Sequence, residues 1–240
     1  MYEYDSRVRL TEADQNQRMT LTAVLNYFQD CSTFHSEDLG VGIKLLETKK
    51  RMWVLRSWKI VIERYPKLAE RIRVGTWPYE FGKMTGRRNF CLSDADGNMA
   101  AYADTLWVFM DMERMRPTRI DPEISSAYTL EPKLALAETE DQIEIPDVME
   151  EEEAFPIHTY HLDVNHHVNN GQYVQLAGNY LPENFQIRQM RAEYKKSAVL
   201  GDIIYPRIGR CKDGYTVLLG DESGRPYAVV EFKQETNTCS

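Results

Sequence analysis

A carboxylate, an amide and an imidazole stand at alternate positions in one segment, at Asp163, Asn165 and His167. The segment precedes a predicted helix, and a helix N-terminus offers unpaired backbone N–H groups and the positive end of a dipole. Side chains placed there can orient or deprotonate water and stabilise negative charge on a carbonyl oxygen, which indicates hydrolysis of an activated acyl group. An ordinary Asp, with a pKa near ~3.9, is a weak base at pH 7. Burial would therefore have to raise the pKa of Asp163, unless this residue mainly positions water.

The same residues also have a structural interpretation. Asp163 and Asn165 could simply cap the following helix, because Asp and Asn are favoured at helix N-termini. Several histidines cluster here, which raises the alternative of a zinc site. If the preceding residues form a strand, however, His158 and His161 point to opposite faces, and this disfavours a shared metal.

Two sets of elements in the same order are predicted to surround this segment. In the first half, Thr20 is a candidate N-cap, and apolar residues at helical spacing predict a helix over residues 20–38. Alternating apolar residues then predict strands over residues 52–62, 71–77, 83–92 and 99–110. In the second half a shorter helix ends before Pro182, and strands are predicted over residues 188–197, 202–210, 214–220 and 226–233.

The repeated order indicates that the two halves are diverged copies of one unit. The offset is 149 residues between Asp14 and Asp163, 131 between Trp77 and Ile208, and 127 between Gly97 and Gly224. Arg18 stands where the second copy has His167, so the first copy is predicted to be non-catalytic. We expect residues 1–128 to form the first unit and residues 155–240 the second. Residues 129–154, which contain prolines and an acidic run, are interpreted as a linker.

Composition excludes several classes of protein. The chain of 240 residues has a net charge of −8 and a pI near 5.3, which argues against binding of nucleic acid through phosphate contacts. No apolar run approaches the ~20 residues of a membrane span, and the first residues resemble no secretory or transit signal. The four cysteines lie far apart without a CxxC pair, which favours reduced thiols and a cytoplasmic location. GxSxG, GxxxxGK[ST] and GxGxxG motifs are absent, so hydrolase-elbow, P-loop and dinucleotide enzymes lose support.

The pattern D-x-N-x-H-V-N-N before a helix, within a repeated helix-plus-sheet unit, resembles the acyl-acyl carrier protein (acyl-ACP) thioesterases of bacteria and plant plastids. The resemblance covers most of residues 1–235. Further segments resemble the family in the same order, namely Thr20 to Asp30, Trp107 to Asp111, Arg119 to Glu123 and Glu193 to Lys196.

This resemblance implies an α+β fold of two tandem hot-dog units, each an antiparallel sheet wrapped around a long helix, which form a pseudo-dimer in one chain. The first unit is then expected to contribute most of the acyl pocket. The implied catalytic residues are Asp163, Asn165 and His167, and the implied substrate-binding residues are Asn169, Lys195, Lys196 and Ser197. No cofactor and no metal are implied. The implied partner is an acyl carrier protein with an acylated 4'-phosphopantetheine arm, and the chain is expected to be a monomer or homodimer.

The sequence departs from the plant members at one place. After the E-Y-basic-basic run, those members continue with a glutamate assigned to water activation and then a cysteine, whereas here the residues are Ser197 and Ala198. A covalent cysteine mechanism at this position is therefore impossible. Glu193 is expected to share a strand face with Ser197, but the two lie ~13 Å apart, so we do not transfer the role to Glu193.

The predicted function is hydrolysis of fatty acyl-ACP to a free fatty acid and holo-ACP, as part of fatty acid biosynthesis. The alternatives are a non-catalytic protein that binds acyl-ACP or acyl-CoA, and a 3-hydroxyacyl-ACP dehydratase. The residue pattern selects no acyl chain length, and it does not separate acyl-ACP from acyl-CoA. Because carrier proteins are strongly acidic, we expect Lys195 and Lys196 to guide docking, with Arg87 and Arg88 as the second choice.

Overall fold

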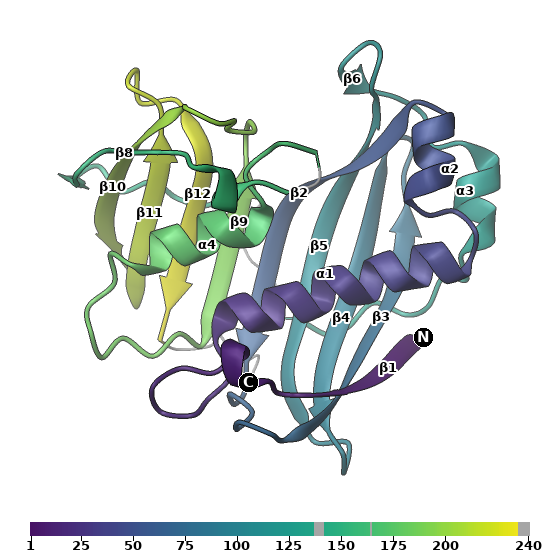
Figure 1. Cartoon of the computed structure of the whole chain (residues 1–240), viewed down its shortest axis with the longest axis horizontal. Coiled ribbons are helices and arrows are strands. Elements are labelled where there is room, and N and C mark those ends of the chain that lie inside the picture. The colour runs from purple at the N-terminus through teal and green to yellow at the C-terminus, as the bar shows by residue number, and fades with distance from the viewer. Residues whose placement is uncertain (137–141, 164, 235–240) are drawn as a thin grey trace. The chain divides into compact units, whose positions relative to one another are not determined.

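The structure is a computed structural model that describes residues 1–136, 142–163 and 165–234 (Figure 1). It divides into two units, which are described separately. Unit 1 comprises Met1–Arg56 and Ile62–Ala135, and unit 2 comprises Ser57–Val61 and the residues from Leu136 onward. The boundary at residues 135 and 136 falls inside the predicted linker.

Unit 1 is an antiparallel sheet with one long helix, α1 (Leu21–Asp38), across its strands (Figure 1). The strand order is β1-β3-β4-β5-β2, and β6 pairs with β5. The strands are β1 (Tyr2–Arg7), β2 (Arg51–Ile62), β3 (Arg71–Phe81), β4 (Thr85–Asp94), β5 (Met99–Asp111) and β6 (Arg116–Pro117). A 3-10 helix η1 (Leu10–Glu12) and two short helices, α2 (Ile43–Thr48) and α3 (Pro122–Ala127), complete the unit.

The helix α1 confirms the helix predicted over residues 20–38. The Thr20 hydroxyl accepts a hydrogen bond from the Ala23 N–H at 3.2 Å, which caps the first turn. Val24, Leu25 and Phe28 recur at helical spacing and are fully buried. The Phe28 ring lies 5.3 Å from the ring of Phe90 in β4, so this apolar face packs on the sheet.

Unit 2 is a smaller antiparallel sheet with the helix α4 (Asn170–Gly178), which contacts β11 and β12. Its strand order is β9-β12-β11-β10-β7; β8 also pairs with β10, and residues 57–61 of β2 pair with β9. The elements are β7 (Glu150–Glu151), β8 (Phe155–Pro156), 3-10 helix η2 (Thr159–His161), β9 (Gln189–Tyr194), β10 (Ile203–Cys211), β11 (Gly214–Gly220) and β12 (Pro226–Lys233). The α4 helix has only nine residues, so it is half the length of α1.

Two local predictions are wrong. The strand predicted over residues 188–197 ends at Tyr194, so Glu193 and Ser197 do not share a strand face. The strand expected before the Asp163 motif is reduced to the two residues of β8, and the 3-10 turn η2 follows. Because His161 lies in this turn, strand alternation does not describe how His158 and His161 are placed. Neither outcome changes the α+β class.

The residues predicted as a linker are attached at both ends. The Trp77 indole N–H donates to the Pro132 carbonyl at 2.9 Å within unit 1. In unit 2, the Ile143 N–H donates to Glu193 Oε1 at 2.7 Å, and Ile143 packs with Leu218 and Val229. Glu150 and Glu151 pair with β10 while their side chains stay exposed. Among the helices that the structure describes, none has the length and hydropathy needed to cross a membrane.

Candidate active site

The predicted catalytic segment is a closed loop whose shape is set by Asp163. The Asp163 Oδ1 accepts hydrogen bonds from the backbone N–H groups of Asn165 at 2.8 Å and His167 at 3.3 Å. The Asp163 N–H donates to the His167 carbonyl at 2.8 Å, and the His166 N–H donates to the Asp163 carbonyl at 3.1 Å. His166 has a φ of +59°, which turns the chain back at this point. Asp163 therefore brings Asn165 and His167 together through the backbone.

The side chains of this loop are accessible for chemistry. Asp163 and His167 are half-buried, and Asn165 is exposed. The Asn165 Nδ2 donates to Asp163 Oδ2 at 3.4 Å, which leaves its second N–H and its carbonyl oxygen available. Within residues 142–163 and 165–234, the His167 ring has no hydrogen-bond partner in unit 2, so both ring nitrogens remain available to a substrate or water.

The loop leads directly into α4. Asn169 is the N-cap of this helix, and its Oδ1 accepts a hydrogen bond from the Gly171 N–H at 2.8 Å. The Asn169 N–H donates to the His161 carbonyl at 2.9 Å, which closes the loop at its base. Asn169 thus has a structural role, while its amide NH₂ could still meet a substrate as predicted.

A buried histidine supports the entry to the loop. The His161 Nδ1 accepts a hydrogen bond from the His158 N–H at 3.0 Å, so the ring is neutral with its proton on Nε2. Burial, with a smaller contribution from His158, lowers the pKa of His161. His161 is therefore a structural residue of the η2 turn.

Tyr173 holds the segment at positions 197 and 198, where the plant members have a glutamate and a cysteine and this chain has Ser and Ala. Tyr173 belongs to α4 and its side chain is buried. Its hydroxyl accepts a hydrogen bond from the Ala198 N–H at 2.8 Å. The Ala198 carbonyl in turn accepts from the Val168 N–H at 3.0 Å. Residues 197 and 198 therefore lie beside the Asp163 loop, with Ser197 exposed. Burial raises the pKa of Tyr173, so its hydroxyl stays protonated at neutral pH.

The two lysines predicted to guide docking are already ion-paired. Lys195 Nζ lies 2.5 Å from Glu193 Oε2, and Lys196 Nζ lies 2.7 Å from Asp221 Oδ2. Lys196 also lies 4.1 Å from the centre of the Tyr227 ring, and its hydrogen bond holds the pKa of Asp221 well below the usual range. Each positive charge therefore has a nearby negative charge that weakens its field.

The second-choice docking residue Arg88 is misassigned. Its side chain is only 8% exposed and lies between α1 and the sheet of unit 1, so it cannot belong to a docking surface. The Arg88 Nη1 lies 3.1 Å from His35 Nδ1 and 3.2 Å from Thr76 Oγ1. The prediction failed because a charged pair in a strand alternates between faces, and Arg88 points inward while Arg87 is half-buried.

The first unit contains a loop with the same hydrogen bonds. Asp14 Oδ1 accepts from the N–H groups of Asn16 at 2.8 Å and Arg18 at 2.9 Å, and Gln17 has a φ of +58°. Thr20 caps α1 as Asn169 caps α4, and the Thr20 N–H donates to the Glu12 carbonyl at 2.9 Å. The predicted offset of 149 residues is confirmed by this loop.

Two further places show the duplication. The Met19 N–H donates to the Pro66 carbonyl at 2.8 Å, as the Val168 N–H donates to Ala198, so the offset here is 132 residues (198 − 66), one more than matching strand ends indicated. The turns after Asp94 and Asp221 both place a glycine at positive φ, Gly97 at +86° and Gly224 at +79°. These matched turns confirm the offset of 127.

Lys196 has a counterpart in this duplication. Arg64, which precedes Lys196 by 132 residues, pairs with Asp94 at 2.9 Å, as Lys196 pairs with Asp221. Both halves therefore use a cation at this point to hold the carboxylate that organises the following turn. This shared ion pair favours a structural role for Lys196.

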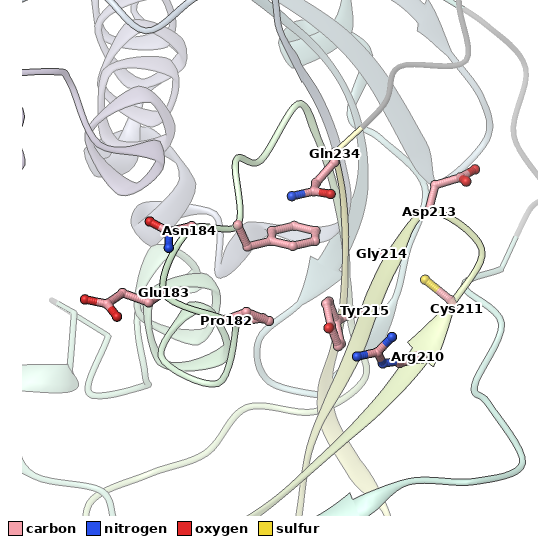
Figure 2. Close-up of a pocket in the computed structure, with 10 residues that line it drawn as sticks. Pro182, Glu183, Asn184, Arg210, Cys211, Asp213, Gly214, Tyr215 and Gln234 are labelled. Atoms are coloured by element: carbon pink, nitrogen blue, oxygen red, sulfur yellow. The ribbon is translucent and has the colours of Figure 1, made fainter.

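A surface pocket of about 620 Å³ lies elsewhere in unit 2 (Figure 2). It is bordered by the turn after α4, with Pro182 and Glu183, and by the β10–β11 hairpin. The Arg210 guanidinium lies 5.6 Å from the centre of the Tyr215 ring in its wall. The pocket follows the C-terminal end of α4 and contains none of the predicted site residues.

Comparison with known proteins identifies the family. The family model described as the acyl-ACP thioesterase N-terminal domain matches residues 1–128, and that of the acyl-ACP thioesterase C-terminal domain matches residues 145–224. The chain therefore belongs to the acyl-ACP thioesterase family.

The matches to individual relatives have low sequence identity but cover most of this chain. The chain is 24% identical over 218 residues to oleoyl-acyl carrier protein thioesterase 2 of Arabidopsis thaliana, covering 82% of this chain and 59% of that protein. It is 26% identical over 218 residues to a dodecanoyl-[acyl-carrier-protein] hydrolase of Umbellularia californica, covering 82% of this chain and 56% of that protein. The chain thus spans less than two thirds of the length of these curated relatives.

Solved structures share the fold. An acyl-ACP thioesterase from Bacteroides thetaiotaomicron aligns with a TM-score of 0.88 at 21% identity, covering 96% of each chain. The 12:0-ACP thioesterase from Umbellularia californica aligns with a TM-score of 0.85 at 21% identity, covering 97% of this chain and 96% of the other. The predicted α+β hot-dog class is confirmed by these structures.

Proposed function

We propose that this chain hydrolyses fatty acyl-ACP, by attack of water on the thioester carbonyl, to give a free fatty acid and the thiol of holo-ACP. The observation that carries the proposal is the closed loop in which Asp163 holds Asn165 and His167 together ahead of α4. Membership of the acyl-ACP thioesterase family supports the same reaction class.

The roles follow from the available atoms. Asp163 is a half-buried carboxylate whose Oδ1 is occupied by two N–H groups, so Oδ2 is the atom that can orient the attacking water. The free N–H of Asn165 and the ring of His167 can donate to the carbonyl oxygen as it becomes negative. The proton from water can pass to His167 or Asp163 and then to the leaving thiolate. The prediction that unit 1 holds the acyl chain is kept as part of this proposal.

The test is turnover of acyl-ACP by the wild type and by His167→Ala. Mass spectrometry should detect the free fatty acid, together with deacylated holo-ACP whose phosphopantetheine arm ends in a free thiol. We expect the variant to lose at least 100-fold in kcat, because one general acid–base or oxyanion group contributes about that much. Full activity of His167→Ala would remove this residue from the mechanism.

A second function is favoured by one observation. Ser197 and Ala198 occupy the positions of the plant family's glutamate and cysteine, and no second carboxylate in residues 142–163 and 165–234 is hydrogen-bonded to the Asp163 loop. A chain that binds acyl-ACP without hydrolysing it would fit this feature. Tight binding of acyl-ACP without release of acid would establish that alternative.

The partner and location belong to the same proposal. The acylated 4'-phosphopantetheine arm of an acyl carrier protein is the expected substrate, and the chain is expected to act as a monomer or homodimer in the cytoplasm. Cys31, Cys91 and Cys211 are free thiols, which supports a reducing compartment.

A further inference from the structure

Four large apolar side chains are exposed on two backbone-paired segments that adjoin the candidate site. We call them the apolar rim; they are Tyr160, Val199, Leu200 and Ile203, with exposed fractions of 73%, 43%, 56% and 47%. Backbone pairing joins the two segments that carry them. Ile203 of β10 pairs with Pro156 of β8, and the Gly201 N–H donates to the Ile157 carbonyl at 3.2 Å (Figure 1).

The apolar rim is continuous with the catalytic loop. Val199 directly follows Ala198, whose carbonyl accepts from the Val168 N–H at 3.0 Å. On the other side, Tyr160 directly precedes His161, whose carbonyl accepts from the Asn169 N–H at 2.9 Å. Both segments of the rim therefore run into the loop that carries Asp163 and His167.

The first unit shows that the fold does not require these apolar residues. The same backbone is built there, with the Ala69 N–H donating to the Val8 carbonyl at 3.0 Å as Gly201 donates to Ile157. The counterparts of Tyr160, Val199, Leu200 and Ile203 in that copy are Thr11, Lys67, Leu68 and Arg71. Three of the four are polar or charged. The first copy does expose one apolar side chain in its own 3-10 turn, Leu10 at 76%, but its residues at the positions of Tyr160, Val199 and Ile203 are not apolar. Exposed apolar side chains at these three positions are therefore particular to the second copy, which points to contact with a partner.

Attraction between opposite charges does not readily explain how this chain would bind an acyl carrier protein. The chain carries −8 overall, acyl carrier proteins are acidic as well, and Lys195 and Lys196 are already paired with Glu193 and Asp221. Contact between two acidic proteins therefore needs a contribution that does not depend on net charge. Burial of exposed apolar side chains supplies such a contribution.

We propose that the apolar rim is the surface on which the acyl carrier protein docks, so that its phosphopantetheine arm enters the Asp163 loop. This rests on the proposed function, since the carrier is a partner only if acyl-ACP is the substrate. The rim contacts the carrier and does not take part in the chemistry.

The test uses the variant Tyr160→Thr/Leu200→Ser/Ile203→Thr, which removes apolar area without adding charge. Its steady-state kinetics are measured with acyl-ACP and with an acyl N-acetylcysteamine thioester that lacks the carrier. We expect KM for acyl-ACP to rise at least tenfold, with kcat and the small-thioester kinetics within twofold of wild type. The matched control is Lys67→Ser/Leu68→Ser in the first copy, which should leave both substrates unchanged.

Salt separates this docking mode from one driven by the lysines. For wild type, KM for acyl-ACP should change less than threefold between 50 and 500 mM NaCl, whereas docking through Lys195 and Lys196 predicts a steep rise. An unchanged KM for acyl-ACP in the triple variant overturns the proposal, and so do equal losses on both substrates.

Binding distinguishes failure of the rim from failure of the proposed function. If wild type turns over neither substrate, the thioesterase proposal fails, and calorimetric titration with acyl-ACP then tests the rim by itself. A Kd at least tenfold weaker for the triple variant than for wild type would support the rim. Equal binding, or no binding by wild type, would overturn it.

Discussion

The loop at residues 9–20 and the loop at residues 158–169 share the backbone hydrogen bonds of their described residues, but their side chains differ. In each, an Asp accepts two backbone N–H groups, a residue at positive φ turns the chain, and an N-cap begins the next helix. Two of the differences concern the site. The first loop has Arg18 at the position equivalent to His167, and its 3-10 turn has Glu12 at the position equivalent to His161. The Glu12 Oε2 accepts from the Arg9 N–H at 2.8 Å, as His161 Nδ1 accepts from His158.

The comparison separates the structural role of Asp163 from its chemical role. Asp14 makes the same backbone hydrogen bonds in a copy predicted to be non-catalytic, so capping is a sufficient reason for an Asp at this position. Chemistry must depend on what differs. His167 is the differing histidine at the alternate position that follows Asp163 and Asn165, where the first loop has Arg18. The capping interpretation and the catalytic interpretation of Asp163 are therefore compatible.

A second difference lies beside the loops. The counterpart of Ala198 is Pro66, which has no N–H, and the counterpart of Tyr173 is Val24, which has no hydroxyl. The second copy therefore has one additional buried donor and one additional acceptor, and they bond to each other at 2.8 Å. An Ala with a buried N–H is tolerated at position 198 because the Tyr173 hydroxyl accepts that N–H.

The largest expected effect comes from converting the second loop to the first. His167→Arg should lower kcat/KM for acyl-ACP at least 100-fold, because the imidazole is lost. The unfolding free energy should change by less than ~0.5 kcal/mol, since Arg18 shows that this backbone accommodates Arg. The control Arg18→His should leave activity within twofold of wild type. A strong loss of activity in the control would contradict the asymmetry between the copies.

Removing the Tyr173 hydroxyl tests the second difference. Tyr173→Phe leaves the Ala198 N–H without its acceptor, which should lower the unfolding free energy by about 1–3 kcal/mol and kcat more than KM. Ala198→Pro removes the orphaned N–H, as in Pro66 of the first copy. The double variant should therefore recover more than half of the lost stability in urea unfolding. Unchanged stability of Tyr173→Phe would show that Tyr173 acts by packing and not through this hydrogen bond.

Paired substitutions test the shared role of the two Asp residues. Asp14→Ala and Asp163→Ala each remove the side-chain oxygen that accepts hydrogen bonds from two backbone N–H groups. Each substitution should therefore lower the unfolding free energy, measured by urea denaturation, by about 1–2 kcal/mol. Asp163→Ala alone should also lower turnover, by at least tenfold. Asp163→Asn keeps a side-chain oxygen as the acceptor, so most of the stability should return while turnover stays low. If Asp14→Ala lowers turnover as much as Asp163→Ala, the copies do not differ as proposed.

The smallest effect is a pH dependence of the second loop. Because burial lowers the pKa of His161, the folded state binds a proton less readily than the unfolded chain does. Its contribution to stability is complete above the unfolded pKa of ~6.5 and is lost as the pH falls through the lower folded value. His35 of unit 1, whose pKa burial lowers to about 4, has the same direction, so a variant is needed to separate them.

The comparison is between wild type and His161→Gln at pH 7.5 and pH 5.5. Wild type should lose more unfolding free energy on acidification than the variant does, by less than ~1 kcal/mol. Hydrogen exchange should place the added opening in residues 158–169, and the first loop, where Glu12 replaces His161, should be unaffected by the substitution. An identical pH response of both proteins would show that His161 does not titrate in this range.

Several features of the molecule were determined by local sequence. The bounds of β11 and β12 match the predicted strands, and α1 begins after Thr20 as its capping and apolar spacing predicted. The sequence also predicted that the Asp163 motif precedes a helix and lies 149 residues after its counterpart Asp14. These succeed because periodicity, capping and turn residues act over a few positions along the chain.

Other features were decided only by the tertiary structure. The strand β9 ends at Tyr194, Lys195 and Lys196 meet Glu193 and Asp221, and Arg88 is buried under α1. The bond from Ala198 to Tyr173 likewise joins residues 25 positions apart. Each outcome depends on which distant segment supplies the opposing charge, hydrogen-bond partner or covering surface. Local residue patterns carry little information on that choice, because it is made when the sheet and helix pack and water is excluded between them.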